Sequence, residues 1–317
     1  MAEEKSSKGK WIAVIIIIVI LGLISMVIAG IMSVIIGITS LDTSSTPIGS
    51  GNVALIPIKG VILTETVSSP FGGSGDTSSS DVVESIEKAD KNPSIKAIVF
   101  EINSPGGSGV ASDEIASAIK RSSKPTVSYV REVGASGAYW VASATDRIFV
   151  NRMSIVGSIG VIASYLEFSG FMQEYNITYE RFVAGKYKDF GSPFRKPTND
   201  ERDLFQIQLD SMHDIFINEV ATNRNMSQEK VRELATGFFF TGEQGINLGL
   251  VDEIGGKEEV KTYLEKELNM TIQFVEYKRK RTLLDLFGEM SSQGTFAMGK
   301  GIGTALVERK PQLSIYT

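Results

Sequence analysis

The sequence predicts an α/β protein in which repeated β-α units build a mostly parallel sheet. From residue 53 onward, short runs rich in β-branched residues alternate with segments of helical periodicity. Glycine-rich turns follow two of the predicted strands, at 104–107 and 134–138. The composition suits a fold with a buried core, because 42% of the 317 residues are apolar and 22% are charged.

The N-terminal residues predict a membrane anchor ahead of this fold. Residues 1–10 contain three lysines, and residues 11–38 form an uncharged apolar run. At about 1.5 Å per residue this run can cross about 30 Å of hydrocarbon. A cleaved signal peptide has a shorter apolar core of roughly 7 to 15 residues, so we expect a retained single span. The positive-inside rule then places the N-terminus in the cytoplasm and the later domain outside the membrane.

The remaining elements are predicted in order along the chain. Residues 39–52 are rich in Ser, Thr and Gly and are predicted to be a linker. The predicted strands cover 53–58, 95–102, 125–130, 147–150 and 177–184. The predicted helices cover 81–89, 109–120, a segment from about 135, 165–175 and 201–223, the last with Phe205, Leu209, Met212 and Phe216 on one stripe. The folded domain is expected to span 53–282, followed by an extended or mobile tail at 283–317.

Composition excludes several kinds of chemistry. The formal charge is −5 without a large basic block, which does not favour nucleic acid as a partner. The chain has no cysteine, so it has no thiol nucleophile, thiolate metal site or disulfide. Its one histidine, His213, lies within a predicted helix without a catalytic motif around it, and we expect a packing or surface residue. No cofactor or metal is expected.

Ser136 is the candidate nucleophile, because it lies between small residues where a predicted strand meets a helix. The first N–H groups of that helix point toward whatever lies beside the serine, which suits an oxyanion. One donor is expected from Gly137 and a second from Gly106 or Gly107 in the preceding glycine turn. The alternative is a glycine-rich turn in which the serine caps the helix.

A serine nucleophile needs a base, and with histidine disfavoured the remaining common base is a neutral lysine. Lys186 and Lys188 follow the last predicted strand. In an extended segment, residues two apart point the same way, so spacing does not choose between them. Both could instead be solvated loop lysines.

Five motifs in a fixed order resemble the bacterial signal peptide peptidases of the SppA type. The motifs are N-S-P-G-G at 103–107, G-A-S-G-A at 134–138, G-S-I-G-V at 157–161, G-K-Y-K-D at 185–189 and T-G-E-Q-G-I-N-L-G-L-V-D-E-I-G-G at 241–256. The resemblance covers roughly residues 53–265. It implies a membrane-anchored serine peptidase with a Ser-Lys dyad, on the fold shared by crotonases and the Clp protease subunit.

The resemblance also implies roles for individual residues. Ser136 matches the nucleophile and Lys188 the general base, while Ser158 matches a serine that orients the base. Gly106 and Gly137 match the positions whose backbone N–H groups hold the oxyanion. Whether Ser136 and Lys188 pair within one subunit or between two stays open at this point.

The implied substrates are extended apolar peptides, namely signal peptides left after secretory processing. Family members form rings, so we expect a homo-oligomer at the membrane. The alternating apolar residues of 313–317 could lie in a peptide groove, as opposed to forming a disordered terminus.

Three other classes of function are alternatives. One is a membrane-tethered scaffold of the same fold that binds peptides or partner proteins without catalysis. Another is an acyl-CoA enzyme, whose substrate is not normally found outside the membrane. The third is an α/β-hydrolase esterase, which needs G-x-S-x-G and a histidine, whereas position 138 is Ala138.

Overall fold

The computed structural model describes residues 16, 18–27, 29–30, 46–48, 50–65 and 75–278. The chain divides into two compact units, and the first of them contributes only residues 16, 18–27 and 29–30, which are helical and exposed. None of the described helices is long and apolar enough to cross a membrane. The predicted anchor at 11–38 and linker at 39–52 lie partly outside the described residues, and the tail at 283–317 lies wholly outside them.

The second unit, Ser45–Val67 with Ser74–Lys278, is built on one sheet. Its described strands are β1 (Thr46–Ile48), β2 (Val53–Leu63), β3 (Thr77–Ser78), β4 (Ala97–Gly107), β5 (Thr126–Ala135), β6 (Arg147–Val150), β7 (Ile155–Gly157), β8 (Phe239–Thr241), β9 (Glu253–Ile254) and β10 (Phe274–Lys278). The main order is β1-β10-β2-β4-β5-β6-β9, with β3 beside β2 and β7 between β5 and β8. Only the β1–β10 and β7–β8 pairs are antiparallel among these strands. The predicted α/β fold with a mostly parallel sheet is confirmed.

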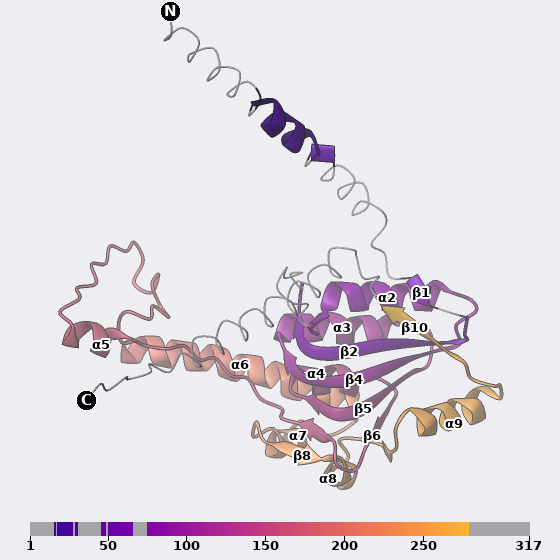
Figure 1. Ribbon diagram of the computed structural model, residues 1–317. Coiled ribbons are helices and arrows are strands. Elements are labelled where there is room, and N and C mark those ends of the chain that lie inside the picture. The colour runs from indigo at the N-terminus through magenta and orange to yellow at the C-terminus, as the bar shows by residue number, and fades with distance from the viewer. Residues whose placement is uncertain are drawn as a thin grey trace, which may run out of the picture. The chain divides into compact units, whose positions relative to one another are not determined.

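Helices cover both faces of the sheet (Figure 1). They are α2 (Ser79–Lys91), α3 (Gly109–Arg121), α4 (Gly137–Ser143), α5 (Ser169–Glu174), α6 (Asn199–Asn223), α7 (Gln228–Leu234), α8 (Gly242–Leu248) and α9 (Lys257–Leu268). Serine caps begin α2 and α3, since Ser78 and Ser108 accept hydrogen bonds from backbone N–H groups of the first turn. The helices α2, α3 and α4 pack on one face of the sheet and α9 packs on the other.

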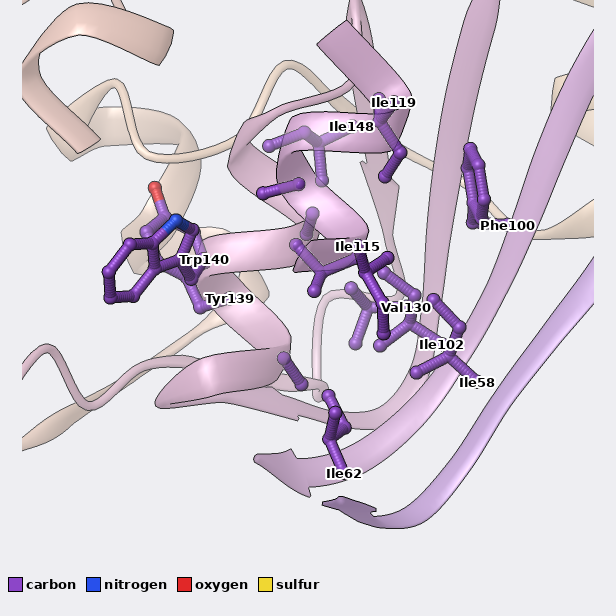
Figure 2. Packing of buried hydrophobic residues seen from close by; sticks show 14 of the residues in the cluster. Ile58, Ile62, Phe100, Ile102, Ile115, Ile119, Val130, Tyr139, Trp140 and Ile148 are labelled. Atoms are coloured by element: carbon purple, nitrogen blue, oxygen red, sulfur yellow. The ribbon is translucent and has the colours of Figure 1, made fainter. Parts of the chain in front are cut away.

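The core explains the β-branched runs that predicted the strands. Ile58, Ile102 and Val130 lie on the adjacent strands β2, β4 and β5, and Figure 2 shows them facing Ile115 of α3. All four side chains are essentially buried. On the opposite face, Leu264 of α9 belongs to a smaller buried cluster. Burial on both faces fits the continuous apolar character of parallel strands.

A break in the β4–β5 ladder positions the serine turn. Ile102 pairs with Val130, but the next pair is Ser104 with Gly134, so β5 contains two more residues than β4 between these pairs. Beyond the break, β5 leaves β6 and pairs with β7. Asn103 accepts hydrogen bonds from two N–H groups of the extra residues through Oδ1. The break therefore directs the end of β5 toward β7.

One expected strand is absent and one observed strand was not expected. Residues 177–184 are irregular and exposed, because none of the described strands pairs with them, and Phe182 is 93% exposed. Strand β10 was not expected; it pairs with β1 and β2, whose residues lie more than 200 positions earlier in the chain. The predicted stripe on α6 is buried only in part, since Phe216 is buried and Met212 is 53% exposed.

Residues 161–198, which we call the arm, lie between β7 and α6 in the sequence. No side chain from 161 to 200 is fully buried. The buried apolar residues of α6 lie in its C-terminal half, where Phe216 stacks on Trp140 of α4 with ring centroids 4.9 Å apart. In Figure 1, α6 runs away from the sheet and α5 lies near its far end. The arm therefore extends outside the packed core.

Candidate active site

Ser136 lies between β5 and α4 in a strained backbone conformation, with φ 53° and ψ −127°. Its N–H donates to the Gly157 carbonyl at 2.8 Å, and its own carbonyl accepts from the N–H of Trp140 at 3.0 Å. The side chain makes no capping hydrogen bond to α4, which removes the alternative of a simple helix cap. Such a conformation costs about 1 to 3 kcal/mol and typically marks a functional residue.

The two glycine turns meet beside Ser136. Gly106 has φ +98°, and a Cβ at this position would lie 2.7 Å from the Gly137 nitrogen and 2.9 Å from Ser136 Cβ. A Cβ on Gly137 would in turn collide with Ser112. Only glycine allows this close approach of two backbones. The predicted pair of oxyanion residues is therefore adjacent to the candidate nucleophile.

The hydrogen-bonding states of the two predicted donors differ. Gly137 is the first residue of α4, so its N–H has no acceptor within the helix. The Gly106 N–H donates to Ser104 Oγ at 3.1 Å. This bond must lengthen or be shared if Gly106 is to donate to an oxyanion. Gly107 also lies close to Gly137. Its backbone nitrogen is 3.4 Å from the position that a Cβ on Gly137 would occupy.

A pocket of about 710 Å³ opens beside Ser136. Its polar lining includes Ser136, Ser158 and His213, and its apolar lining includes Ile162, Leu209 and Phe238. The lining comes from the serine turn, the segment after β7, the middle of α6 and the turn before β8. A concave site with a few polar groups on an apolar wall is typical of a ligand-binding pocket.

Ser158 lies in the same pocket and also has a positive φ, 51°. Its N–H donates to the Phe238 carbonyl at 3.0 Å, and its Oγ donates to the Gly237 carbonyl at 3.0 Å. Because the hydroxyl proton is used in this bond, the lone pairs of the oxygen can accept from an amine. The structure thus brings Ser158 and Ser136 to one site.

The two candidate lysines lie in the arm and do not line this pocket. The segment is a series of turns, with the Lys188 N–H donating to the Gly185 carbonyl at 3.1 Å, so the expectation of an extended segment is wrong. Lys186 Nζ pairs with Asp200 at 2.8 Å, and this hydrogen bond raises the pKa of Lys186. Among the described residues, Lys188 Nζ has no hydrogen-bond or ion-pair partner.

His213 is half-buried and lies in the pocket with Ser136, a neighbour that the sequence did not indicate. Its Nε2 is buried and has no hydrogen-bond partner in the described part of the chain. Helical periodicity could have indicated this position, because His213 follows Leu209 by four residues and precedes the buried Phe216 by three.

A strained serine next to two glycine turns, at the carboxyl ends of adjacent parallel strands, is an arrangement that suits a serine hydrolase site. Sequence comparison gives the family. Peptidase family S49 matches residues 118–271. A Methanocaldococcus jannaschii protein named as a protease is 36% identical over 224 residues, which are 70% of this chain and 71% of its own. The chain belongs to peptidase family S49 and is a serine peptidase of the SppA type.

Two further similarities were found. An Enterococcus faecium protein named as a signal peptide peptidase SppA is 36% identical over 201 residues, covering 62% of this chain and 58% of that protein. A solved structure of ClpP1 from Listeria monocytogenes aligns with 65% of this chain and 92% of its own, at 15% identity and a TM-score of 0.43. Membership of a serine peptidase family disfavours the scaffold, acyl-CoA and esterase alternatives.

Proposed function

We propose that this chain is a membrane-anchored endopeptidase that degrades remnant signal peptides with a Ser136–Lys188 dyad. The observation that carries the proposal is the geometry of Ser136. This strained serine makes no capping hydrogen bond with its side chain and lies beside two glycine turns and a pocket. The family assignment supports peptide hydrolysis. The relative named as a signal peptide peptidase supports the substrate class.

The proposed mechanism assigns one step to each residue. The neutral amine of Lys188 takes the proton of Ser136 Oγ as the oxygen attacks the peptide carbonyl carbon. The N–H groups of Gly137 and Gly106 stabilise the resulting oxyanion. Protonated Lys188 then gives its proton to the leaving amine as the C–N bond breaks. Water attacks the acyl-enzyme by the same route and releases the second peptide.

Lys188 is preferred over Lys186 because their amines have different partners. Lys186 donates to Asp200, which favours the charged ammonium, and a charged ammonium cannot accept a proton. Lys188 has no such partner in the described residues. Ser158 would orient the Lys188 amine, since Ser158 lines the pocket and its proton is already donated to Gly237, which leaves the oxygen free to accept.

We further propose that Lys188 reaches Ser136 from a neighbouring copy of the chain. Lys188 does not line the Ser136 pocket of its own chain. The arm that carries it exposes large apolar side chains, with Leu166 73% and Phe182 93% exposed. Such apolar exposure is typical of an interaction surface. A homo-oligomer, consistent with a ring, would bury these residues and complete the site.

His213 is a second candidate base, favoured by its position in the Ser136 pocket. An imidazole with a free nitrogen is a common base for serine. This alternative keeps the serine peptidase but needs no second subunit. The two bases therefore predict different results when inactive variants are mixed.

Substrate and location are proposed from the pocket and the N-terminal sequence. Ile162, Leu209 and Phe238 give the pocket an apolar wall that suits apolar peptide side chains. The apolar run at 11–38 would hold the enzyme in the cell membrane as a single span, with a cytoplasmic N-terminus and an extracytoplasmic peptidase domain.

The test is complementation between two inactive variants of the full chain. Ser136→Ala and Lys188→Ala are expected to lose activity on an apolar fluorogenic peptide when assembled separately. Co-assembled, they are expected to recover a fraction of the wild-type rate, because some interfaces combine an intact Ser136 with an intact Lys188. Absence of recovery would place the dyad within one chain, and wild-type activity of either variant alone would exclude it.

A further inference from the structure

Arg195 connects the turn that carries Lys188 to the start of α6. Its guanidinium donates to both Asp189 oxygens, with Nε–Oδ2 at 2.8 Å and Nη2–Oδ1 at 2.9 Å. It also donates to both Glu201 oxygens, with Nη1–Oε2 at 2.8 Å and Nη2–Oε1 at 2.5 Å. Paired hydrogen bonds of this kind fix geometry as well as charge. Arg195 therefore holds two carboxylates in fixed positions.

The Glu201 end of this connection is anchored in α6. Glu201 Oε2 accepts the Thr198 N–H at 2.8 Å, and Thr198 Oγ1 accepts the Glu201 N–H at 3.3 Å. These two bonds form the capping box that begins α6. The C-terminal half of the same helix is buried in the core through residues such as Phe216. The connection thus leads from the exposed arm to a rigid element.

The Asp189 end lies directly beside Lys188 in sequence. Asp189 also accepts from Arg181, whose Nε is 2.6 Å from Oδ2, and its carbonyl accepts the Ser192 N–H at 3.1 Å. Both carboxylate oxygens of Asp189 are consequently bound to arginine. Only 13% of the Asp189 side chain and 18% of the Arg195 side chain are exposed, within an arm in which most residues are exposed.

We propose that Arg195 is a positioning residue for the catalytic lysine: it fixes the Lys188 turn to α6 and keeps the Asp189 carboxylate from pairing with the Lys188 amine. The proposal rests on the proposed role of Lys188 as base. A free carboxylate near an amine favours the ammonium, which cannot take the Ser136 proton. Holding Asp189 in two arginine contacts removes that competitor, while the tie to α6 limits the positions that the turn can adopt.

Several charged groups around the turn have identified partners. Lys186 pairs with Asp200, and Arg181 pairs with Asp189. The titratable and charged groups that contact one another around the turn are Arg181, Lys186, Tyr187, Asp189, Arg195, Asp200 and Glu201. Asp189 is the carboxylate adjacent to Lys188 in the chain, and loss of Arg195 would free its Oδ1 while Arg181 still holds Oδ2.

The experiment compares full-chain variants in kinetics over a pH series on an apolar fluorogenic peptide. Arg195→Gln is expected to lower kcat roughly tenfold with a smaller change in KM, because positioning is lost. The midpoint of the alkaline limb of kcat/KM is expected to rise by about one pH unit. Adding Asp189→Asn should return the midpoint to its wild-type value without restoring kcat. Arg195→Lys keeps the positive charge, so its kcat and its midpoint should lie between those of Arg195→Gln and the wild type.

Arg202→Gln is the matched control, because it removes an exposed arginine near the start of α6, the helix to which Arg195 is bound. It should leave kcat, the pH midpoint and the melting temperature unchanged. A wild-type profile in Arg195→Gln would overturn the proposal, as would a loss of rate without a shift of the midpoint. If Lys188→Ala is inactive, either of those results rejects the positioning role of Arg195 and leaves the proposed dyad in place. Wild-type activity of Lys188→Ala would instead reject the dyad, and this proposal with it.

Discussion

Ser136 and Gly106 lie so close together that the backbone conformation of each residue is tightly constrained. Both have positive φ, and the space where a Gly106 side chain would begin is occupied by the Gly137 nitrogen and Ser136 Cβ. The sequence indicated glycine-rich turns at both places, and hence the nucleophile and its neighbours. Their contact could not be predicted, because it depends on how far β4 and β5 extend beyond the break in their ladder.

Gly106→Ala should therefore impair the site selectively. The added methyl would force the two turns apart, and positive φ strains alanine, so kcat/KM should fall by roughly a hundredfold, as when an oxyanion donor is displaced. Unfolding free energy should fall by about 1 to 3 kcal/mol. Gly109→Ala is the control, since nothing lies within 4 Å of its added Cβ. Equal activity of the two variants would contradict the proposed geometry.

His213 is the residue whose neighbours the sequence did not indicate. The sequence predicted a packing or surface role, and the structure adds that the helix brings this residue to the Ser136 pocket. Spacing also left Lys186 and Lys188 undecided, because residues two apart point the same way in an extended segment. The Lys186–Asp200 ion pair, which separates them, joins residues of the arm and α6 and has no local sequence pattern.

At the scale of elements, the strands of the central sheet were predictable and the arm was not. The predicted strand at 177–184 has β-branched and aromatic residues, but a strand also requires a partner, and the described chain gives it none. Strand β10 was missed for the opposite reason, since its partners are distant in sequence and its own pattern is short. Pairing over long distances in the chain decides both cases.

Burial on α3 gives a direct stability test at this scale. Ile115 is fully buried against the sheet, whereas Val110 on the same helix is 64% exposed. Ile115→Ala should lower the unfolding free energy by about 2 to 5 kcal/mol through lost contacts and a cavity. Val110→Ala should change it by less than about 0.5 kcal/mol. Urea unfolding measures both, and similar losses would contradict the assigned packing face.

The start of α6 should depend on pH through Glu201. Hydrogen bonds from Arg195, and then from the Thr198 N–H, lower the pKa of Glu201 to about 2 from an ordinary value near 4.5. A depressed pKa stabilises the folded helix start above pH 4.5, and this contribution is lost as pH falls toward 2. Hydrogen exchange of the first-turn amides should accelerate over that window relative to the intrinsic rate.

Glu201→Gln is the matching variant for this measurement. It cannot ionise, so exchange at the first turn of α6 should be faster at neutral pH and should lose its dependence between pH 4.5 and 2. Amides near Phe216, in the buried half of the helix, provide the internal reference. A wild-type helix start whose protection is constant across the window would count against the role of the ionised carboxylate.

At the scale of the whole molecule, the exposed arm and a Ser136 pocket that Lys188 does not line favour the proposed assembly of several copies of the chain. Phe182 is 93% exposed and Lys188 does not line the Ser136 pocket. The enzyme in detergent should be a homo-oligomer by light scattering, and Phe182→Asp should weaken assembly and activity together. An active monomer would contradict a dyad shared between copies. The sequence alone indicated an oligomer only through family resemblance.

The measurement that tests the dyad most directly is the pH profile of kcat/KM on a short apolar fluorogenic peptide. It compares the wild-type chain with Lys188→Ala, Lys186→Ala and His213→Ala. The proposal predicts activity that rises through an alkaline limb and is abolished only by Lys188→Ala, while Lys186→Ala and His213→Ala retain the limb. Loss of activity in His213→Ala, with Lys188→Ala still active, would contradict it and assign the base to the histidine.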